Sequence, residues 1–127
     1  MDVKPAQTNV IQVKIIIMGK FIITQRINKE YQFNLKAGNG EIILTSEGYI
    51  QKASCHKGIE SVKINSQDDS RYERKIAVNS KHYFVLKARN GEIIGRSQLY
   101  SSTSGMEIGI ASVKVNAPTA EIIDQTL

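Results

Sequence analysis

The chain has 127 residues, a formal net charge of +5 at pH 7, one cysteine and no tryptophan. This length suits one domain, or two small halves that share a core, and such a fold needs neither a disulfide nor a metal ion for stability. The single thiol of Cys55 excludes an internal disulfide, and the most apolar run, residues 15–23, is too short to span a bilayer. We therefore expect a cytoplasmic protein without membrane contact.

Residues 1–17 precede the first predicted strand and form an N-terminal extension. We expect this extension to be disordered or to add one strand to the sheet, and to be dispensable for stability.

The dominant signal in the rest of the chain is an internal repeat. When the sequence is shifted by 51 positions, residues 33–65 align with residues 84–116 without a gap, and 17 of the 33 aligned positions are identical. So many identities at one fixed offset indicate a tandem duplication. Two residues that this offset aligns are called counterparts below.

Each copy begins with a strand, near residues 20–27 and 71–78, followed by a hairpin. The same turn dipeptide occurs in both hairpins: Asn39-Gly40 and Asn90-Gly91. Between alternating runs this dipeptide predicts a two-residue type I′ turn, in which both residues have positive φ. In the first copy this register places Ile42 and Leu44 on the core face and Ile43 on the solvated face.

A helix is predicted after each hairpin, because apolar residues then recur with helical spacing. They are Cys55, Ile59 and Val62 in the first copy, and Met106, Ile110 and Val113 in the second. Ser104 and Glu107 predict a capping box for the second helix, and Asn65 and Asn116 are expected as left-handed residues after the two helices.

Two pairs of counterparts indicate close packing around the helices. Gly58 and Gly109 fall inside the predicted helices, where glycine costs about 1 kcal/mol relative to alanine, so a neighbouring element is expected to approach closely. Tyr49 and Tyr100 are interpreted as anchors of the junction between strand and helix rather than as ligand contacts.

These motifs resemble the YegP-like family of small uncharacterised proteins. The resemblance lies in "F-x-L-K-A-x-N-G-E-I-I", then "S-x-x-Y", then "G-I-x-S-V-K-x-N", and covers residues 18–118 in both copies. It implies an α+β fold of two tandem β-β-β-α-β repeats that form one continuous antiparallel sheet, with both helices on one face. It also implies pseudo-twofold symmetry with exchanged C-terminal strands, and no established activity, ligand or catalytic residue.

The domain boundaries follow from the repeat and the resemblance. Residues 18–127 are expected to form one domain, composed of repeat 1 (18–66) and repeat 2 (71–122). Because the family pattern begins near Met18, residues 1–17 depart from it, and initiation at Met18 instead of Met1 is an alternative.

The candidate binding residues are cations on the helix-free side of the predicted sheet. Lys36, Lys87, Arg89 and Arg96 share that face and could bind an anion or a partner. The interpretation that the register favours, however, pairs Lys36 with Glu41, and Lys87 with Glu92, as ordinary surface ion pairs.

Catalytic and metal sites are not predicted. Ser46 and Ser97 recur at the end of a strand, where a hydroxyl usually bonds to the backbone, and no histidine recurs to activate them. Cys55 and His56 are adjacent on a helix and point in different directions, so they do not form a shared metal site. We expect no enzymatic activity, no cofactor and no metal.

The function that the sequence favours is a small cytoplasmic binding or interaction module without catalytic activity. The alternative is a sequence-tolerant nucleic-acid or anion binder that uses the open sheet face. The partner is not identified, and the intact chain is expected to be a monomer that acts as an internal pseudo-dimer.

Overall fold

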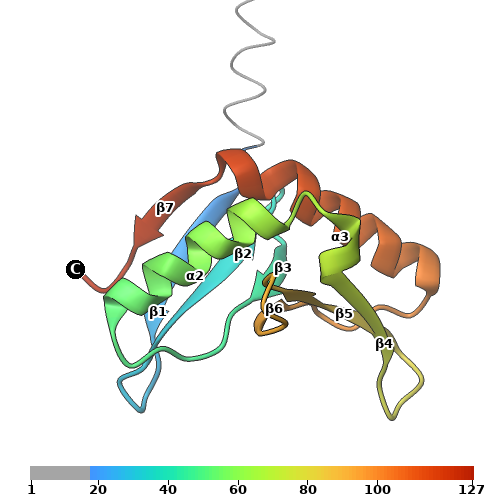
Figure 1. Ribbon diagram of the computed structural model, residues 1–127, viewed down its shortest axis with the longest axis horizontal. Coiled ribbons are helices and arrows are strands. Elements are labelled where there is room, and N and C mark those ends of the chain that lie inside the picture. The colour runs from blue at the N-terminus through green and yellow to red at the C-terminus, as the bar shows by residue number, and fades with distance from the viewer. Residues whose placement is uncertain (1–17) are drawn as a thin grey trace, which may run out of the picture.

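The duplicated sequence folds as two copies of one strand–hairpin–helix unit. The computed structural model describes residues 18–127 (Figure 1), so the predicted extension, residues 1–17, lies outside the described residues. The first copy contains β1 (Lys20–Gln25), β2 (Tyr31–Lys36), β3 (Ile42–Thr45) and α2 (Lys52–Asn65). The second contains η1 (Asp69–Arg71), β4 (Tyr72–Ile76), β5 (His82–Lys87), β6 (Ile93–Arg96), α3 (Thr103–Asn116), η2 (Ala117–Thr119) and β7 (Glu121–Asp124), where η denotes a short 3-10 helix.

All seven described strands form one sheet in the order β4-β5-β6-β3-β2-β1-β7. Both helices cover the same face of it, and the two halves of the sheet diverge from β3 and β6 at its centre (Figure 1). The predicted α+β fold of tandem repeats is therefore confirmed. The opposite side of the sheet is called the helix-free face below. Neither helix in the described part of the chain is long and apolar enough to cross a bilayer.

The two repeats meet at the centre of the sheet, where Thr45 lies opposite Arg96 in an antiparallel pair. These two residues are counterparts, so the pseudo-twofold axis passes between them. Side chains provide most of the contact here: Leu44 packs against Gly95, where an added Cβ atom would lie 2.5 Å from the Leu44 Cγ atom. The helices also cross the boundary, because α2 contacts β5 and β6 and α3 contacts β3.

The sheet differs from the expectation in two details. β7 runs parallel to β1, with Phe21 opposite Ile122, so the sheet is mixed rather than wholly antiparallel. Only this C-terminal strand crosses to the other repeat. The counterparts of β7 are residues 70–73. They already lead into β4 of repeat 2, because the link from α2 to β4 is too short to add a separate strand.

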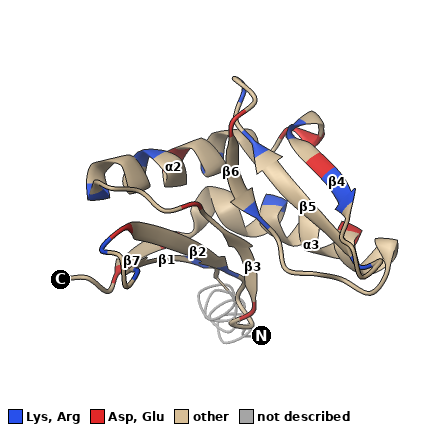
Figure 2. Cartoon of the chain, turned by 90° about the horizontal axis from the view of Figure 1, so that it is seen from below, with Lys and Arg blue, Asp and Glu red and all other residues tan. Residues whose placement is uncertain are grey.

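β4 is consequently an edge strand, and ion pairs surround it. The Arg74 guanidinium pairs with Glu107 on α3 and, through Nη2 at 3.2 Å, with Asp69. The Lys114 ammonium group completes this network 3.0 Å from Asp69. Figure 2 shows acidic and basic residues side by side along β4. Charged side chains on an edge strand oppose pairing with another chain, so this edge is protected from aggregation.

Aromatic residues form the same core arrangement in both repeats. The Phe33 ring is packed edge to face with Phe21 at 5.7 Å and stacked on Tyr49 at 6.4 Å between centroids. The counterparts repeat this arrangement: Phe84 lies 5.6 Å from Tyr72 and 6.5 Å from Tyr100. The helical residues predicted to face the core are all buried: Cys55, Ile59, Val62, Met106, Ile110 and Val113. One core thus extends through both repeats.

The predicted type I′ turns are wrong. Gly40 has a φ of +86°, but Asn39 is not among the residues with positive φ, and the Gly40 amide donates to the Ala37 carbonyl oxygen at 2.9 Å. The Ala37 amide in turn donates to Glu41, which makes a three-residue loop with a bulge at Gly40. Asn90-Gly91 repeats this geometry, with Gly91 at a φ of +89°.

A second irregularity within β3 restores the predicted pairing further along the hairpin. Lys36 lies opposite Ile42, but Leu35 lies opposite Leu44, so Ile43 is an extra residue between these pairs. The bulge turns Ile43 into the core, at 2% exposure, and leaves Ile42 41% exposed. The predicted core position of Ile42 is therefore wrong, because a bulge reverses the alternation of side chains.

The helix ends also differ from the prediction. The N-cap of α3 is Ser102, whose hydroxyl accepts from the Gly105 amide at 3.0 Å, while Glu107 pairs with Arg74 instead of closing a capping box. Asn65 and Asn116 remain helical instead of adopting the left-handed conformation. Their side-chain amides donate to the carbonyl oxygens of Ser61 and Ser112, at 2.9 and 2.8 Å.

The expected close approach at the helix glycines is present. A Cβ atom added to Gly58 would overlap the Tyr49 hydroxyl and lie 2.9 Å from the Tyr49 Cζ atom. A Cβ atom at Gly109 would overlap the Tyr100 hydroxyl and lie 2.6 Å from its Cζ atom. The neighbour is thus a tyrosine ring that lies across the helix, which agrees with the interpretation of Tyr49 and Tyr100 as junction anchors.

We expect Gly58→Ala and Gly109→Ala each to destabilise the protein by about 1–3 kcal/mol, because the added methyl group collides with a stacked tyrosine. Urea denaturation of the full chain measures this. Tyr100→Phe removes the colliding hydroxyl, so the double variant with Gly109→Ala should lose less than the sum of the two single changes. If both alanine variants were more stable than the wild type, the helix propensity of alanine would outweigh the contact.

We also expect the fragment 71–127 not to be a stable monomer. Its β7 strand belongs beside β1, and its core is completed by Leu44 and α2 of the other repeat. A chain of about 57 residues with an incomplete core lies near the lower limit of independent stability. Light scattering after gel filtration should show a dimer or an aggregate. A cooperatively folded monomer would mean that the repeats are independent domains.

Candidate functional site

Two adjoining hollows next to the pseudo-twofold axis form the candidate binding site. Phe84 and Leu44 point into the core, so their neighbours Tyr83 and Thr45 point to the helix-free face. Arg96 lies on this face as well, opposite both Thr45 and Val85. The hollows share Arg96 and Ser97 as a common wall.

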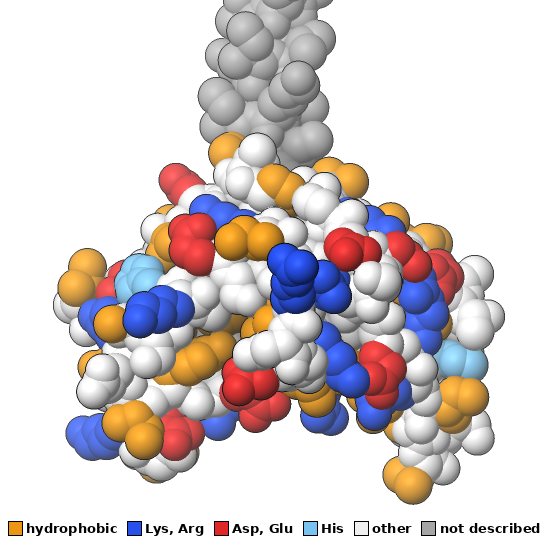
Figure 3. Space-filling model, in the orientation of Figure 1, with side chains coloured by type: hydrophobic (Ala, Val, Ile, Leu, Met, Phe, Trp, Pro, Cys, Tyr) orange, Lys and Arg blue, Asp and Glu red, His pale blue; other side chains and the backbone are white. Residues whose placement is uncertain are grey.

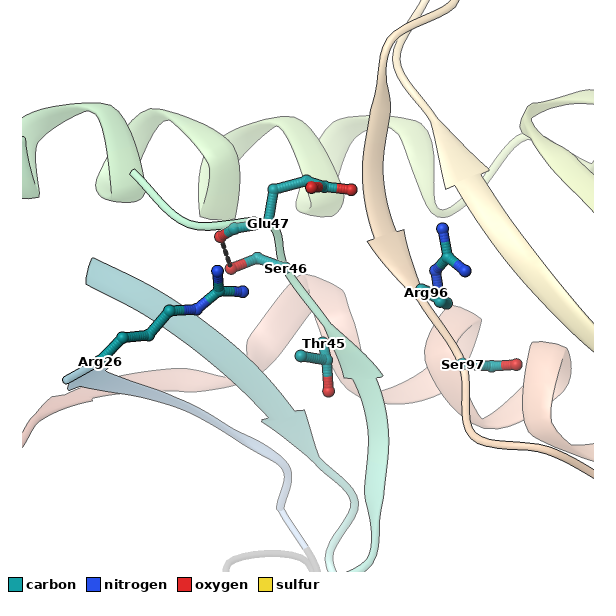
Figure 4. Close-up of a pocket in the computed structure, with 6 residues that line it drawn as sticks. All are labelled: Arg26, Thr45, Ser46, Glu47, Arg96 and Ser97. Atoms are coloured by element: carbon teal, nitrogen blue, oxygen red, sulfur yellow. Dashed lines mark hydrogen bonds between the residues drawn. The ribbon is translucent and has the colours of Figure 1, made fainter. Parts of the chain in front are cut away.

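The axial hollow, of about 310 Å³, lies at the boundary between the repeats. It is lined by Arg26, Thr45, Ser46, Glu47, Arg96 and Ser97. Arg26 and Arg96 enter from opposite sides, and Glu47 lies between them (Figure 4). The Arg26 Nε donates to Gln32 Oε1 at 2.6 Å, and its Nη1 lies 3.6 Å from Glu30. The axial hollow thus has cations on both sides.

The lateral hollow, of about 510 Å³, lies beside the β4–β5 turn and is more apolar. Its walls include Ile76, Val78, Tyr83 and Leu99. Three of these are exposed aliphatic side chains: Ile76 at 69%, Val78 at 109% and Leu99 at 47% of full exposure. The Arg96 guanidinium lies over the Tyr83 ring, 5.6 Å from its centroid, and so separates this apolar surface from the axial hollow.

Lys87, one of the four predicted cations, is neutralised by a carboxylate. Its ammonium group pairs with Glu73 on β4, which also binds Lys75 at 2.9 Å. The hydrogen bond from Lys87, followed by that from Lys75, lowers the pKa of Glu73 to about 2. Glu73 therefore stays ionised at neutral pH, and its charge is shared between Lys75 and Lys87.

The other predicted cations are dispersed over the sheet. Lys36 lies directly opposite Lys20, at the end of the face where β1 and β2 pair. Arg89 is exposed in the turn between β5 and β6. Of the four, only Arg96 lines the axial or lateral hollow. The four residues therefore do not form one continuous patch.

The predicted ion pairs between Lys36 and Glu41, and between Lys87 and Glu92, do not form. Glu41 lies in the turn bulge and accepts a hydrogen bond from Gln98 in the other repeat. The extra residue in each turn moves the glutamate away from the lysine with which the two-residue turn would have aligned it.

The two repeats differ at the hollows, although they share their core. Phe33 and Phe84, like Tyr49 and Tyr100, are identical counterparts in the interior. In contrast, Tyr83, Arg96 and Leu99 have Gln32, Thr45 and Gly48 as their counterparts. The molecule therefore carries one asymmetric site instead of two equivalent ones.

Sequence reasoning identified Arg96 on this face but missed the rest of the site. Arg26, Glu47 and Leu99 lie in a turn or just after a strand, where alternation along a strand assigns no face. A comparison of counterparts would have found Leu99, because a large apolar residue there replaces a glycine of repeat 1.

Ser46 and Ser97 have structural roles although they border the axial hollow. The Ser46 hydroxyl accepts from the Phe33 amide at 2.9 Å and donates to the Glu47 carbonyl oxygen at 2.8 Å. Ser97 makes the same two bonds with Phe84 and Gln98, at 3.0 and 2.7 Å. Both hydroxyls are buried, and each donates one hydrogen bond to the backbone and accepts one from it, as the sequence predicted.

Cys55 is buried in the core, and desolvation is the main cause that raises the pKa of its thiol to about 11. His56 follows it on α2 but does not join it in a metal site. Within residues 18–127, no group of three or more histidine, cysteine, aspartate or glutamate side chains could hold a metal ion.

We expect the native Cys55 thiol to react with Ellman's reagent at pH 8 more than about tenfold more slowly than the unfolded chain. A thiolate is required for the reaction, and burial both suppresses its formation and blocks access. The measurement compares initial rates in buffer and in 6 M guanidinium chloride. Equal rates would contradict the burial of Cys55.

Sequence comparisons extend over most of the chain. The family described as "Domain of unknown function (DUF1508)" matches residues 28–73 and again residues 77–124. The UPF0339 protein YegP of Escherichia coli O6:H1 is 52% identical over 108 residues, which cover 85% of this chain and 98% of that protein. A UPF0339 protein of Acinetobacter baylyi is 55% identical over 108 residues, covering 85% and 97%. The chain belongs to the YegP family.

Solved structures of YegP-family proteins have the same fold. The solution structure of E. coli YegP superimposes with a TM-score of 0.82 at 49% identity, covering 87% of this chain and 95% of that one. The solution structure of a UPF0339 protein of Shewanella oneidensis gives a TM-score of 0.79 at 49% identity, covering 84% and 90%. The E. coli protein is described as having unknown function, and the descriptions of these relatives name no enzymatic activity.

Proposed function

We propose that this member of the YegP family is a small cytoplasmic binding module without catalytic activity, and that its ligand binds at the axial and lateral hollows. The observation that carries this proposal is the asymmetry of the site. Repeat 2 places a tyrosine, an arginine and a leucine where repeat 1 has glutamine, threonine and glycine. The fold itself does not require these three substitutions, because both repeats build the same core without them in common.

The chemistry of the site supports binding rather than catalysis. The two hydroxyls that border the axial hollow are committed to backbone hydrogen bonds. Where acidic side chains in the described residues have a shifted pKa, hydrogen bonds and cations lower it, whereas a general acid at neutral pH requires a raised one. The single thiol, which is buried and unpaired, supports the cytoplasmic part of the proposal, because reducing compartments keep thiols free.

A nucleic-acid ligand is less well supported. Lys87 is neutralised by Glu73, and the side of the molecule in Figure 3 shows cations interleaved with carboxylates rather than one basic patch. Single-stranded nucleic acids bind to exposed aromatic rings, but Arg96 already covers the ring of Tyr83.

The proposed function is tested by selecting peptides from a displayed random library on the immobilised full-length chain. We expect enriched peptides whose binding is lost in Tyr83→Gln and retained in Ile108→Lys. Both substitutions introduce the residue of repeat 1, but Ile108 is 70% exposed on α3, away from the hollows.

Two results would contradict the proposal. One is a selection that enriches no binder. The other is a set of binders that tolerate Tyr83→Gln but are lost in Ile108→Lys, which would move the binding surface to the helices.

A further inference from the structure

We propose that the ligand of this site is an acidic and apolar segment of another protein, bound in extended form. A carboxylate of the segment would pair with the Arg96 guanidinium at the edge of the axial hollow, and an apolar side chain two residues away would occupy the lateral hollow. This inference rests on the proposed binding function and specifies its ligand class.

Arg96 is a cation whose guanidinium group is free to bind a ligand. Arg26, Arg71 and Arg74 each lie within 4 Å of a carboxylate. The guanidinium groups of Arg89 and Arg96 have neither an ion-pair partner nor a hydrogen-bond acceptor among residues 18–127. Of these two, only Arg96 lines the hollows, and it lies over the Tyr83 ring. A guanidinium group stacked on an aromatic ring keeps its edge donors free, and their planar arrangement matches a carboxylate.

The apolar surface lies directly beside this cation. The lateral hollow starts at Arg96 itself, and exposed Leu99 and Val78 line it on the other side. A ligand that fits both hollows must therefore carry a negative charge and an apolar group within a short distance. An extended peptide provides this combination where an acidic and an apolar residue are separated by one residue, because side chains at positions i and i+2 point to the same side.

The shape of the site suits a polypeptide segment better than a small molecule. Small-molecule sites usually enclose most of their ligand, whereas these hollows adjoin each other on the outside of the sheet. A polypeptide segment can span both of them. The net charge of +5 also favours association with an acidic partner over a basic one.

The test uses the full-length chain and a fluorescein-labelled decapeptide with blocked ends, in which glutamate and leucine or phenylalanine take turns at every second position and serine stands between them. A matched peptide carries glutamine at every glutamate position. Fluorescence anisotropy should show binding of the acidic peptide and at least about tenfold weaker binding of the glutamine peptide, because the charge-assisted hydrogen bonds are lost. This comparison requires no change in the protein.

Protein variants then assign the effect to Arg96. Arg96→Thr, which introduces the residue of repeat 1, should weaken binding of the acidic peptide about tenfold or more, with the fold verified by circular dichroism. Arg89→Thr removes the same charge from the exposed β5–β6 turn and should leave binding unchanged. Equal binding of both peptides, or an unchanged affinity in Arg96→Thr, would overturn the inference.

Other probes separate this inference from the proposed function. If an oligothymidylate or laurate binds in an Arg96-dependent manner and the acidic peptide does not, the ligand class is wrong although the site is right. If peptides selected from the random library bind through Tyr83 without an acidic residue, the inference fails and the binding function stands. If no probe depends on Tyr83 or Arg96, both fail.

Discussion

The two halves of the sheet are joined at its centre by one registered residue pair, Thr45 opposite Arg96, in the described part of the chain. So little shared backbone cannot hold the centre of the sheet together by hydrogen bonds alone, although β7 joins the repeats a second time by pairing with β1 at the edge. The contact depends on side chains: Leu44 lies against Gly95, and each helix reaches over strands of the other repeat. Because a fully buried leucine or isoleucine stabilises a fold by about 1.5–3 kcal/mol, a few such contacts exceed the contribution of the single backbone pair. The same arrangement leaves the axial hollow at the boundary.

Much of the architecture could be predicted because the same motifs occur twice in the sequence. The 51-residue offset fixes the lengths of the hairpins and helices, and the helical spacing of Cys55, Ile59 and Val62 identifies the buried face of α2. The turn type could not be predicted, because Asn-Gly suits a type I′ turn as well as a type I turn followed by a left-handed glycine. That ambiguity of one residue was enough to exchange the predicted positions of Ile42 and Ile43. The run of serine and threonine before α3 likewise offered several caps, among which the sequence does not choose.

The candidate site was harder to predict than the fold. Alternation along a strand placed Lys87 and Arg96 on the helix-free face, but it does not show which side chains from neighbouring strands lie beside them. Glu73 neutralises Lys87 from β4, and Tyr83 supports Arg96 from the adjacent strand β5. Lys87 and Arg96 have the same charge and lie on the same face, but these neighbours pair the first and leave the second available to a ligand. Arg26 and Leu99 belong to turns and loops, whose direction depends on tertiary packing rather than on a local pattern.

The parallel pairing of β7 with β1 has a consequence for how the protein emerges from the ribosome. Lys20 on the first strand pairs with Glu121 on the last, so repeat 1 cannot be completed until nearly the whole chain has been synthesised. At roughly 5–20 residues per second, the outer edge of β1 stays uncovered for on the order of 5–20 s. β4, in contrast, can recruit its charged partner Asp69 as soon as it is made, because that residue directly precedes it. Among the strands of residues 18–127, β1 is therefore the one whose outer edge waits longest for its partner during synthesis.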